Sequence, residues 1–279
     1  MAAKAGWRPH WGVGPIILWS LLAIIVALVT ALATAPASLV DWGLGKVTEG
    51  RVRLADAAGS IWQGRGRIVL VDVATLTERE RRGAIGTRVA ESLPGVVVPG
   101  TIRWGISPLP LLIGQIRASA SHESMAKPAE IVGDYRRVSI SPGALQLPDV
   151  SLARLGSPWN TVRPTTALAV NWQPIVIENG RATGKATLDL SDVASALTPV
   201  RPLGAYRIAI DGGAQATQIS MTSLNGPLRL SGNGNWTPAA GLRFTAYAEA
   251  DESERPRLQS LLNLLGRREG TRTMIKIGA

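Results

Sequence analysis

Residues 182–190 read ATGKATLDL, and this stretch decides the fold class of the chain. Side chains alternate between the two faces of an extended strand. The apolar residues from Ala186 onward would therefore share one face, while Lys185, Thr187 and Asp189 would share the other. Residues 242–248, LRFTAYA, alternate in the same way. This pattern is typical of an antiparallel sheet with one face packed and one face in water, so the sequence predicts a mainly β fold.

Similar short runs recur along most of the chain, separated by Gly, Pro, Asn and Asp. Runs that are rich in β-branched residues and bounded by turn residues predict many short strands. The predicted strands are Arg67–Val73, Thr101–Trp104, Ile116–Ala120, Ala167–Trp172, Ala182–Leu190, Tyr206–Asp211, Leu228–Gly232, Leu242–Ala248 and Thr273–Ile277.

A loose repeat links three tryptophans, Trp104, Trp172 and Trp236. Each is followed within four residues by a proline, then by a glycine and a further strand-like run. Proline stops strand pairing and glycine permits a tight turn. Repeated units of this kind predict an elongated or curled sheet. Coincidence in a chain rich in Gly and Pro is the alternative.

Two short helices are expected beside the sheet. Residues 191–197, SDVASAL, would form one, with Ser191 as N-cap and Pro199 beyond its end. Residues 253–265 would form the other, with Gly266 as C-cap. Its leucines 258, 261, 262 and 265 share one face, which predicts a helix docked on the sheet.

The N-terminal region predicts a membrane anchor. Residues 11–40 carry no charged side chain, and Ile16–Ala33 is an apolar run long enough to cross a hydrocarbon layer of about 30 Å. Trp11 and Trp42 flank this run like interface anchors. The expected organisation is a cytoplasmic tail over residues 1–12, a transmembrane helix over 13–35 and a β-rich domain over 36–279 beyond the membrane. A cleaved signal peptide ending at Ala35 is the alternative.

The composition argues against several kinds of chemistry. The chain has no cysteine and only two histidines, His10 and His122, so neither a thiolate zinc site nor an HExxH motif can form. The net charge of +10 suits anionic partners such as lipid head groups, but the densest basic cluster, residues 79–82, is interrupted by Glu80. The sequence therefore predicts no enzyme, no cofactor, no metal and no nucleic acid. Carboxylates at strand ends, at 72, 189 and 211, are the ones to test for glycoside hydrolysis.

Two groups of residues are candidates for interaction with a partner. Gly64 and Gly66 would let another backbone approach closely beside Trp62, although an ordinary β-bulge explains the two glycines equally well. The repeat tryptophans Trp104 and Trp236 complete the candidates.

Four short motifs resemble the type II secretion system protein N family. They are residues 54–64 (LADAAGSIWQG), 100–104 (GTIRW), 230–236 (LSGNGNW) and 261–266 (LLNLLG), in this order. The resemblance implies a single-pass protein of the cell inner membrane with a periplasmic domain. It also implies a structural or accessory role in export of folded proteins, with other secretion components and membrane lipids as partners. The sheet pattern is similar to that of AsmA-like periplasmic proteins too, so lipid handling is the alternative function.

Overall fold

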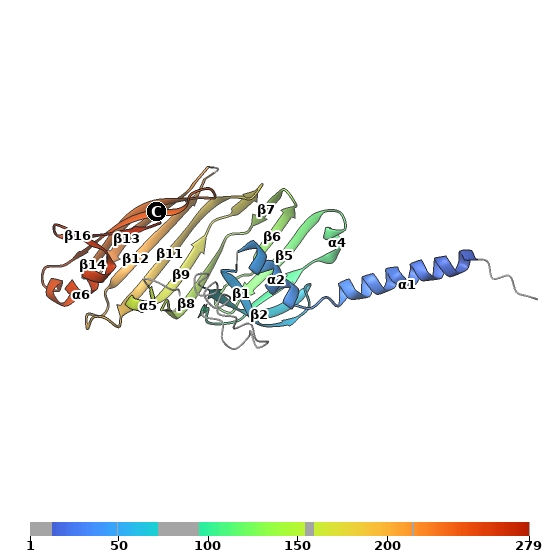
Figure 1. The fold of residues 1–279 in the computed structure, drawn as a ribbon, viewed down its shortest axis with the longest axis horizontal. Coiled ribbons are helices and arrows are strands. Elements are labelled where there is room, and N and C mark those ends of the chain that lie inside the picture. Colours follow the sequence, from blue (N-terminus) through green and yellow to red (C-terminus); the bar gives the residue numbers. More distant parts are fainter. Residues whose placement is uncertain (1–12, 49, 72–94, 154–158, 214, 279) are drawn as a thin grey trace, which may run out of the picture.

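The computed structural model describes residues 13–48, 50–71, 95–153, 159–213 and 215–278, with side chains omitted at 13–18, 95, 159 and 160. Within these described ranges, seventeen strands form one antiparallel sheet, accompanied by a long N-terminal helix and several shorter ones (Figure 1). The helices are α1 (Val13–Ala33), α2 (Ser38–Val47), α4 (Pro108–Leu111), α5 (Trp159–Val162) and α6 (Arg255–Leu265). The strands are β1 (Val52–Gly59), β2 (Gln63–Val71), β3 (Gly95–Val97), β4 (Ile102–Ile106), β5 (Gln115–His122), β6 (Ala129–Asp134), β7 (Arg137–Ile140), β8 (Gly143–Ser151), β9 (Pro164–Trp172), β10 (Ile175–Glu178), β11 (Arg181–Ser195), β12 (Gly204–Gly212), β13 (Thr217–Asn225), β14 (Leu228–Thr237), β15 (Gly241–Ala250), β16 (Arg267–Glu269) and β17 (Arg272–Ile277).

The strands follow one another as a meander. β2 lies between β1 and the pair β3 and β4, and the sheet continues through β5 and β6 to β7. β7 pairs with β10, and the next segment, β8, pairs with β9. β10 and β9 pair in turn with successive parts of β11. β12 to β15 follow in order, and β17 and β16 close the far edge. The mainly β antiparallel fold predicted from sequence is confirmed.

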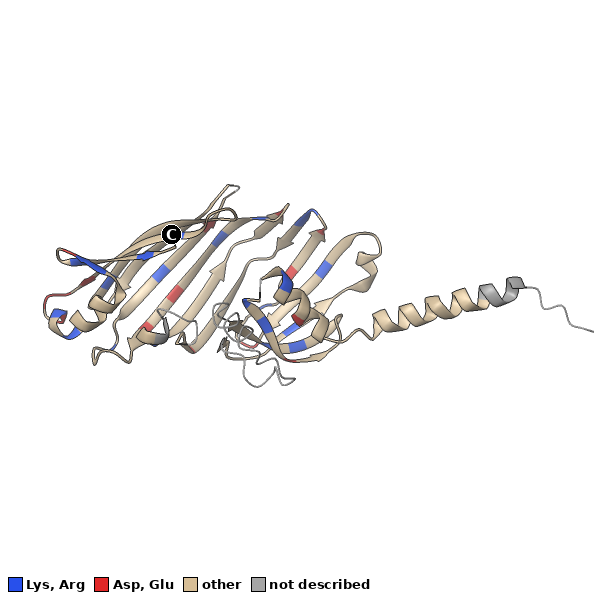
Figure 2. Cartoon of the chain, viewed as in Figure 1, with Lys and Arg blue, Asp and Glu red and all other residues tan. Residues whose placement is uncertain are grey.

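One face of this sheet is apolar from β8 to β17, and we call it the inner face. Residues that lie directly opposite each other on neighbouring strands point to the same face, so the pairing register traces this face across the sheet. One such row runs Leu145, Val170, Leu188, Ile208, Met221, Gly232, Ala246, Ile275. The opposite, outer face carries charged pairs such as Asp189 with Arg207 and Lys185 with Asp211. Figure 2 shows charged residues spread over many of the strands.

Two hydrophobic clusters cover the inner face in part. Leu258 and Leu261 of α6 are fully buried against Tyr206, Leu228 and Ala248. Val96 and its neighbours from β2 and β3 pack across the sheet onto Leu147 and Leu168, so the N-terminal edge curls over the inner face. Between the two clusters, inner-face side chains such as Val170, Leu188 and Ile208 are half-buried, whereas Trp236 and Leu242 near the strand ends are exposed.

All nine predicted strands overlap observed strands. Trp104, Trp172 and Trp236 all lie in strands, β4, β9 and β14, but the repeat does not keep one form. After Trp172 pairing does not stop at the proline, because β10 pairs with β7 from Ile175 onward, and after Trp104 the helix α4 precedes the returning strand. The predicted helix over residues 253–265 is α6, which begins at Arg255. Gly266 follows it in extended backbone with φ 175°, so it does not form a left-handed cap.

The predicted helix over residues 191–197 is wrong. β11 continues to Ser195 across an irregularity at residues 191–194, where Asp192 takes a positive φ of 52°. Val193 and Ser195 are buried there, and the Ser195 hydroxyl bonds to the backbone oxygen of Val162. The bulge lets the strand keep its packing while its pairing shifts by one residue.

α1 is a regular helix of 21 residues whose side chains from Trp19 to Leu32 are largely exposed. In the part of the chain that the structure describes, no helix satisfies both the length and the hydropathy of a membrane span. The transmembrane helix expected over residues 13–35 and the division of the chain at residues 12 and 35 stay predictions. Residues 79–82, His10 and Trp11 lie outside the described residues.

Candidate interaction surfaces

Trp62 joins α1 to the sheet. It lies in the turn between β1 and β2, and its Nε1–H donates to the backbone oxygen of Leu32 at 2.9 Å. The neighbouring Ile61 N–H donates to Ala35 O at 2.9 Å, and Trp104 Nε1–H donates to Ile61 O at 3.2 Å. Trp62 and Trp104, predicted to meet a partner, therefore contact the end of α1 and the β1–β2 turn within the chain.

Gly64 and Gly66 lie within β2, and Gly66 lies opposite a bulge that β1 forms at Asp56 and Ala57, as the bulge alternative expected for this glycine. Gly64 pairs with Trp104, and a Cβ on Gly64 would overlap the Trp104 indole. The close approach that these glycines permit is therefore made by other parts of the same chain, namely Trp104 at Gly64 and β1 at Gly66. Two further glycines lie opposite aromatic rings in the same way, Gly143 opposite Trp172 and Gly234 opposite Phe244.

Trp236 lies apart from the other candidates. It is 44% exposed near the end of β14, opposite Leu242 of β15. The strands from β5 to β13 separate it from Trp62, Gly64, Gly66 and Trp104, which gather around β2 and β4. The five predicted residues therefore do not form one site.

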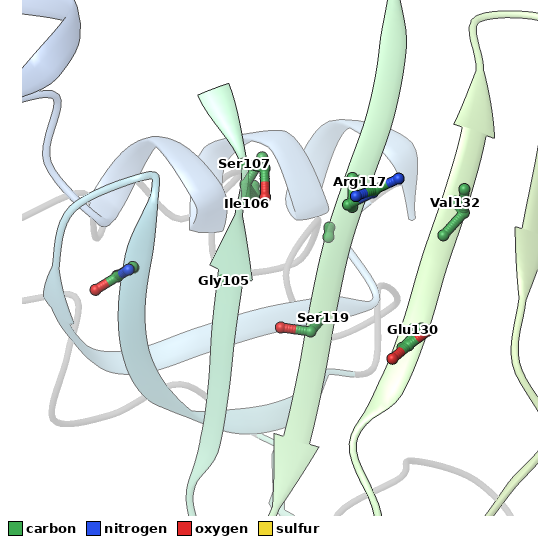
Figure 3. A pocket seen from close by; sticks show the side chains of 9 residues that line it. Gly105, Ile106, Ser107, Arg117, Ser119, Glu130 and Val132 are labelled. Atoms are coloured by element: carbon green, nitrogen blue, oxygen red, sulfur yellow. The ribbon is translucent and has the colours of Figure 1, made fainter. Parts of the chain in front are cut away.

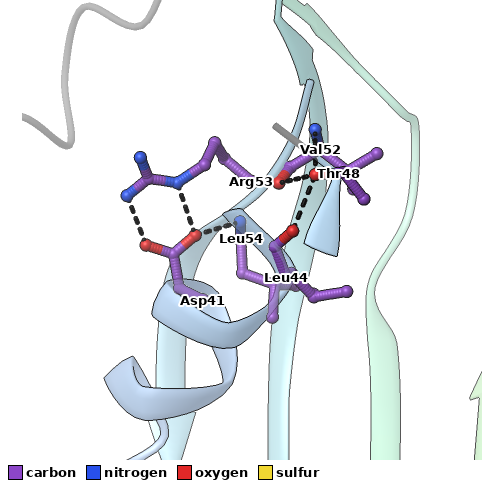
Figure 4. A network of polar contacts seen from close by, with 6 residues as sticks. All are labelled: Asp41, Leu44, Thr48, Val52, Arg53 and Leu54. Atoms are coloured by element: carbon purple, nitrogen blue, oxygen red, sulfur yellow. Dashed lines mark hydrogen bonds and ion pairs between the residues drawn. The ribbon is translucent and has the colours of Figure 1, made fainter. Parts of the chain in front are cut away.

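Side chains from α2 close the N-terminal edge of the sheet (Figure 4). The Asp41 carboxylate accepts from the Leu54 N–H at 2.7 Å and from both Nε and Nη2 of Arg53 at 2.9 and 2.6 Å. The Thr48 hydroxyl accepts from the Val52 N–H at 3.1 Å. An edge strand offers unpaired N–H groups to a partner. Here Asp41 of α2 and Thr48, the residue after α2, accept from two such N–H groups, at alternate positions of β1. Sequence reasoning missed α2, because two glycines weaken its local helical signal.

The electrostatics of Asp41 reflect this position. Partial burial raises the pKa of its carboxyl, but the bonds from Arg53 and Leu54 outweigh burial and hold the pKa below its ordinary value. The ion pair in turn raises the pKa of Arg53. The edge is thus closed by a charged pair rather than by a neutral hydrogen bond.

The far edge of the sheet is less protected. β16 has three residues, Arg267, Arg268 and Glu269, and all three are exposed. Among the described residues it pairs only with β17. Charged residues on a short edge strand limit indiscriminate pairing but leave its backbone groups available to a specific partner.

The outer face is hollowed over β2, β4, β5 and β6 (Figure 3). The hollow has a volume of about 500 Å³, and Arg117, Ser119 and Glu130 project into it around Gly105. Its lining mixes both charges with hydroxyls and resembles an ordinary wet sheet surface more than an apolar ligand pocket.

The carboxylates proposed for testing are engaged in ion pairs. Asp189 pairs with Arg207 at 2.6 Å, which lowers the pKa of the Asp189 carboxyl, and Asp211 pairs with Lys185 at 3.2 Å. Both lie on the outer face, and Asp72 lies outside the described residues. His122 is buried, and its Nδ1 accepts from the Ser124 N–H at 3.1 Å. Over the described part of the chain, no group of three His, Cys, Asp or Glu side chains could hold a metal ion.

Comparison with curated proteins and with solved structures gives no match to this chain. The model of the family "Type II secretion system (T2SS), protein N" matches residues 50–275, which covers nearly the whole sheet and α6. The chain therefore belongs to the type II secretion system protein N family.

Proposed function

We propose that this protein is a structural or accessory, non-enzymatic part of the type II secretion system, anchored in the inner membrane with its sheet in the periplasm. The family match over residues 50–275 carries this proposal. Its partners are other inner-membrane and periplasmic components of the apparatus, together with membrane lipids.

The anchorage rests on the N-terminal sequence and on α1. Apolar side chains from Trp19 to Leu32 are exposed around this helix, and Lys4 and Arg8 precede it. A positive N-terminal flank supports a cytoplasmic location for that end, under the positive-inside rule. The bond from Trp62 to Leu32 O fixes the sheet close to the end of the helix. Without lipid around it, so much exposed apolar surface would be unfavourable.

Partner docking by strand addition belongs at the β16 edge, because α2 obstructs β1. A segment that pairs with β16 would gain main-chain hydrogen bonds without displacing any described strand. Arg268→Pro should impair assembly, since proline cannot donate and disturbs pairing. Arg268→Ala removes the same side chain and serves as the matched control. Secretion by both variants at the wild-type rate would rule out this edge.

Deletion of the gene tests the proposed function. Folded enzymes that the host normally secretes should accumulate in the periplasm, and the full-length gene should restore their export. Unchanged export from the deletion strain would contradict the proposal.

A second function, handling of lipid acyl chains, is favoured by one observation. A lipid groove needs a continuous apolar lining that its own side chains leave open. The inner face is continuously apolar, and Val170, Leu188, Ile208 and Ile219 lie half-buried on it between the two covering clusters. Mass spectrometry of the gently purified chain should then detect bound phospholipid at a defined ratio. Recovery of lipid-free protein would contradict this function.

A further inference from the structure

A surface turn at one corner of the sheet exposes four large apolar side chains in succession. In α4 and the residues after it, Leu109, Leu111, Leu112 and Ile113 are 76%, 39%, 81% and 74% exposed. The turn is well formed, because the N–H groups of residues 112, 113 and 114 bond to carbonyls three residues earlier, each at 3.1 Å. Its backbone is therefore satisfied, while its side chains have no apolar cover among the described residues.

The next hairpin adds an aromatic ring and positive charge to this corner. Gln115 pairs with Asp134, so the turn lies beside the β6–β7 turn at residues 135–136. Tyr135 is 80% exposed, and the Arg136 guanidinium lies 5.2 Å from the centre of its ring. The Asp134 carboxylate accepts from the backbone N–H groups of Arg136 and Arg137, which fixes this turn. Exposed leucines beside Tyr and Arg are typical of a surface that lies at a membrane interface.

The corner lies at the end of the sheet from which α1 leaves (Figure 1). Ile106 at the end of β4 donates its N–H to Trp62 O at 2.7 Å, and Trp62 bonds to Leu32 O of α1. Two residues after Ile106, the chain enters α4. A bilayer that held α1 would therefore be close to this turn.

We propose that the turn at residues 109–113 inserts its apolar side chains into an anionic bilayer surface, with Arg136 and Arg137 at the head groups. The occupant is phospholipid rather than protein, because a cationic rim beside the anchor complements acidic head groups. This inference rests on the proposed anchorage by α1. It gives the protein a second membrane contact that would set the tilt of the sheet.

Single cysteines test the proposal, because the full chain contains none. Leu112→Cys is labelled with an environment-sensitive fluorophore, and the full chain is reconstituted into phosphatidylcholine vesicles with or without phosphatidylglycerol. Leu224→Cys is the matched control, since Leu224 is a 51% exposed leucine at the opposite ends of the strands. Val29→Cys reports on α1 itself.

The label at 112 should shift to the blue and be quenched by brominated lipid, more strongly with phosphatidylglycerol, while the label at 224 should stay in water. Arg136→Gln with Arg137→Gln should remove the dependence on phosphatidylglycerol. A label at 112 that stays in water while 29 is quenched would overturn the inference but leave the anchorage intact. Labels at both 29 and 112 in water would overturn both. Insertion at 112 that is independent of phosphatidylglycerol would refute the anionic surface.

Discussion

Asp41 is a residue at which a single charge holds an edge of the sheet. Asp41→Ala removes acceptors for Arg53 and the Leu54 N–H, so it should lower the free energy of unfolding by about 1–3 kcal/mol. Asp41→Asn keeps one acceptor and should cost less. Urea unfolding of the full chain in detergent, followed by tryptophan fluorescence, measures both losses. Equal stability of all three proteins would contradict this account.

The same carboxylate predicts a pH dependence. The pKa of Asp41 is lower in the folded protein than its unfolded value of about 3.9. Its contribution is therefore complete above the unfolded pKa and is lost as the pH falls through the folded pKa. The difference in unfolding free energy between wild type and Asp41→Asn should stay constant from about pH 7 to 5 and shrink below about pH 4. A difference that persisted at the lowest pH would show that charge is not its source.

Gly64 is a residue at which the absence of a side chain makes room for an aromatic ring. Gly64→Ala should destabilise the chain by about 1–3 kcal/mol, because its Cβ would overlap the Trp104 indole. Gly43→Ala is the matched control. It lies in α2 with open space around it, and alanine there should be neutral or stabilising. Combining Gly64→Ala with Trp104→Leu should recover part of the loss. Additive losses would mean that the two residues do not interact.

At the scale of the element, α6 covers one end of the inner face through a narrow apolar stripe. Leu261 is 1% exposed, so Leu261→Ala should cost about 2–5 kcal/mol through the cavity that it leaves. Leu264 on the same helix is 54% exposed, and Leu264→Ala should change stability by less than about 0.5 kcal/mol. Thermal unfolding of the two variants measures this contrast. Similar losses would show that α6 is not docked by this face.

At the scale of the whole molecule, the inner face joins the strands from β8 to β17 into one apolar surface. Leu188→Glu places a charge on that surface, whereas Thr187→Glu places it on the outer face one residue away. If the inner face holds acyl chains, Leu188→Glu should lose bound lipid and Thr187→Glu should retain it. Lipid mass spectrometry on both variants, with circular dichroism to check folding, measures the effect. Equal lipid content would place the lipid elsewhere.

Local patterns in the sequence determined part of the fold, namely nine of the observed strands and the faces of their side chains. No predicted strand corresponds to β1, β3, β6, β7, β8, β10, β13 or β16. The alternation in residues 182–190 is enough to orient β11, because strand periodicity depends only on neighbouring residues. The leucine spacing of α6 works in the same way. The misassigned residues 191–197 show where this reasoning fails. The local preference of this segment for a helix was outweighed by burial of Val193 and Ser195 in a strand that continues across a bulge.

Only the tertiary structure decided what the faces and edges meet. Trp62 and Gly64 were predicted as contacts for a partner, yet the chain itself uses them at the end of α1 and beneath Trp104. The closure of β1 by Asp41, and the position of residues 109–113 near the exit of α1, depend on segments that are distant in sequence. Periodicity specifies which way a side chain points along its own strand. It does not specify which distant segment will lie opposite, because that choice is made by packing and pairing across the whole sheet.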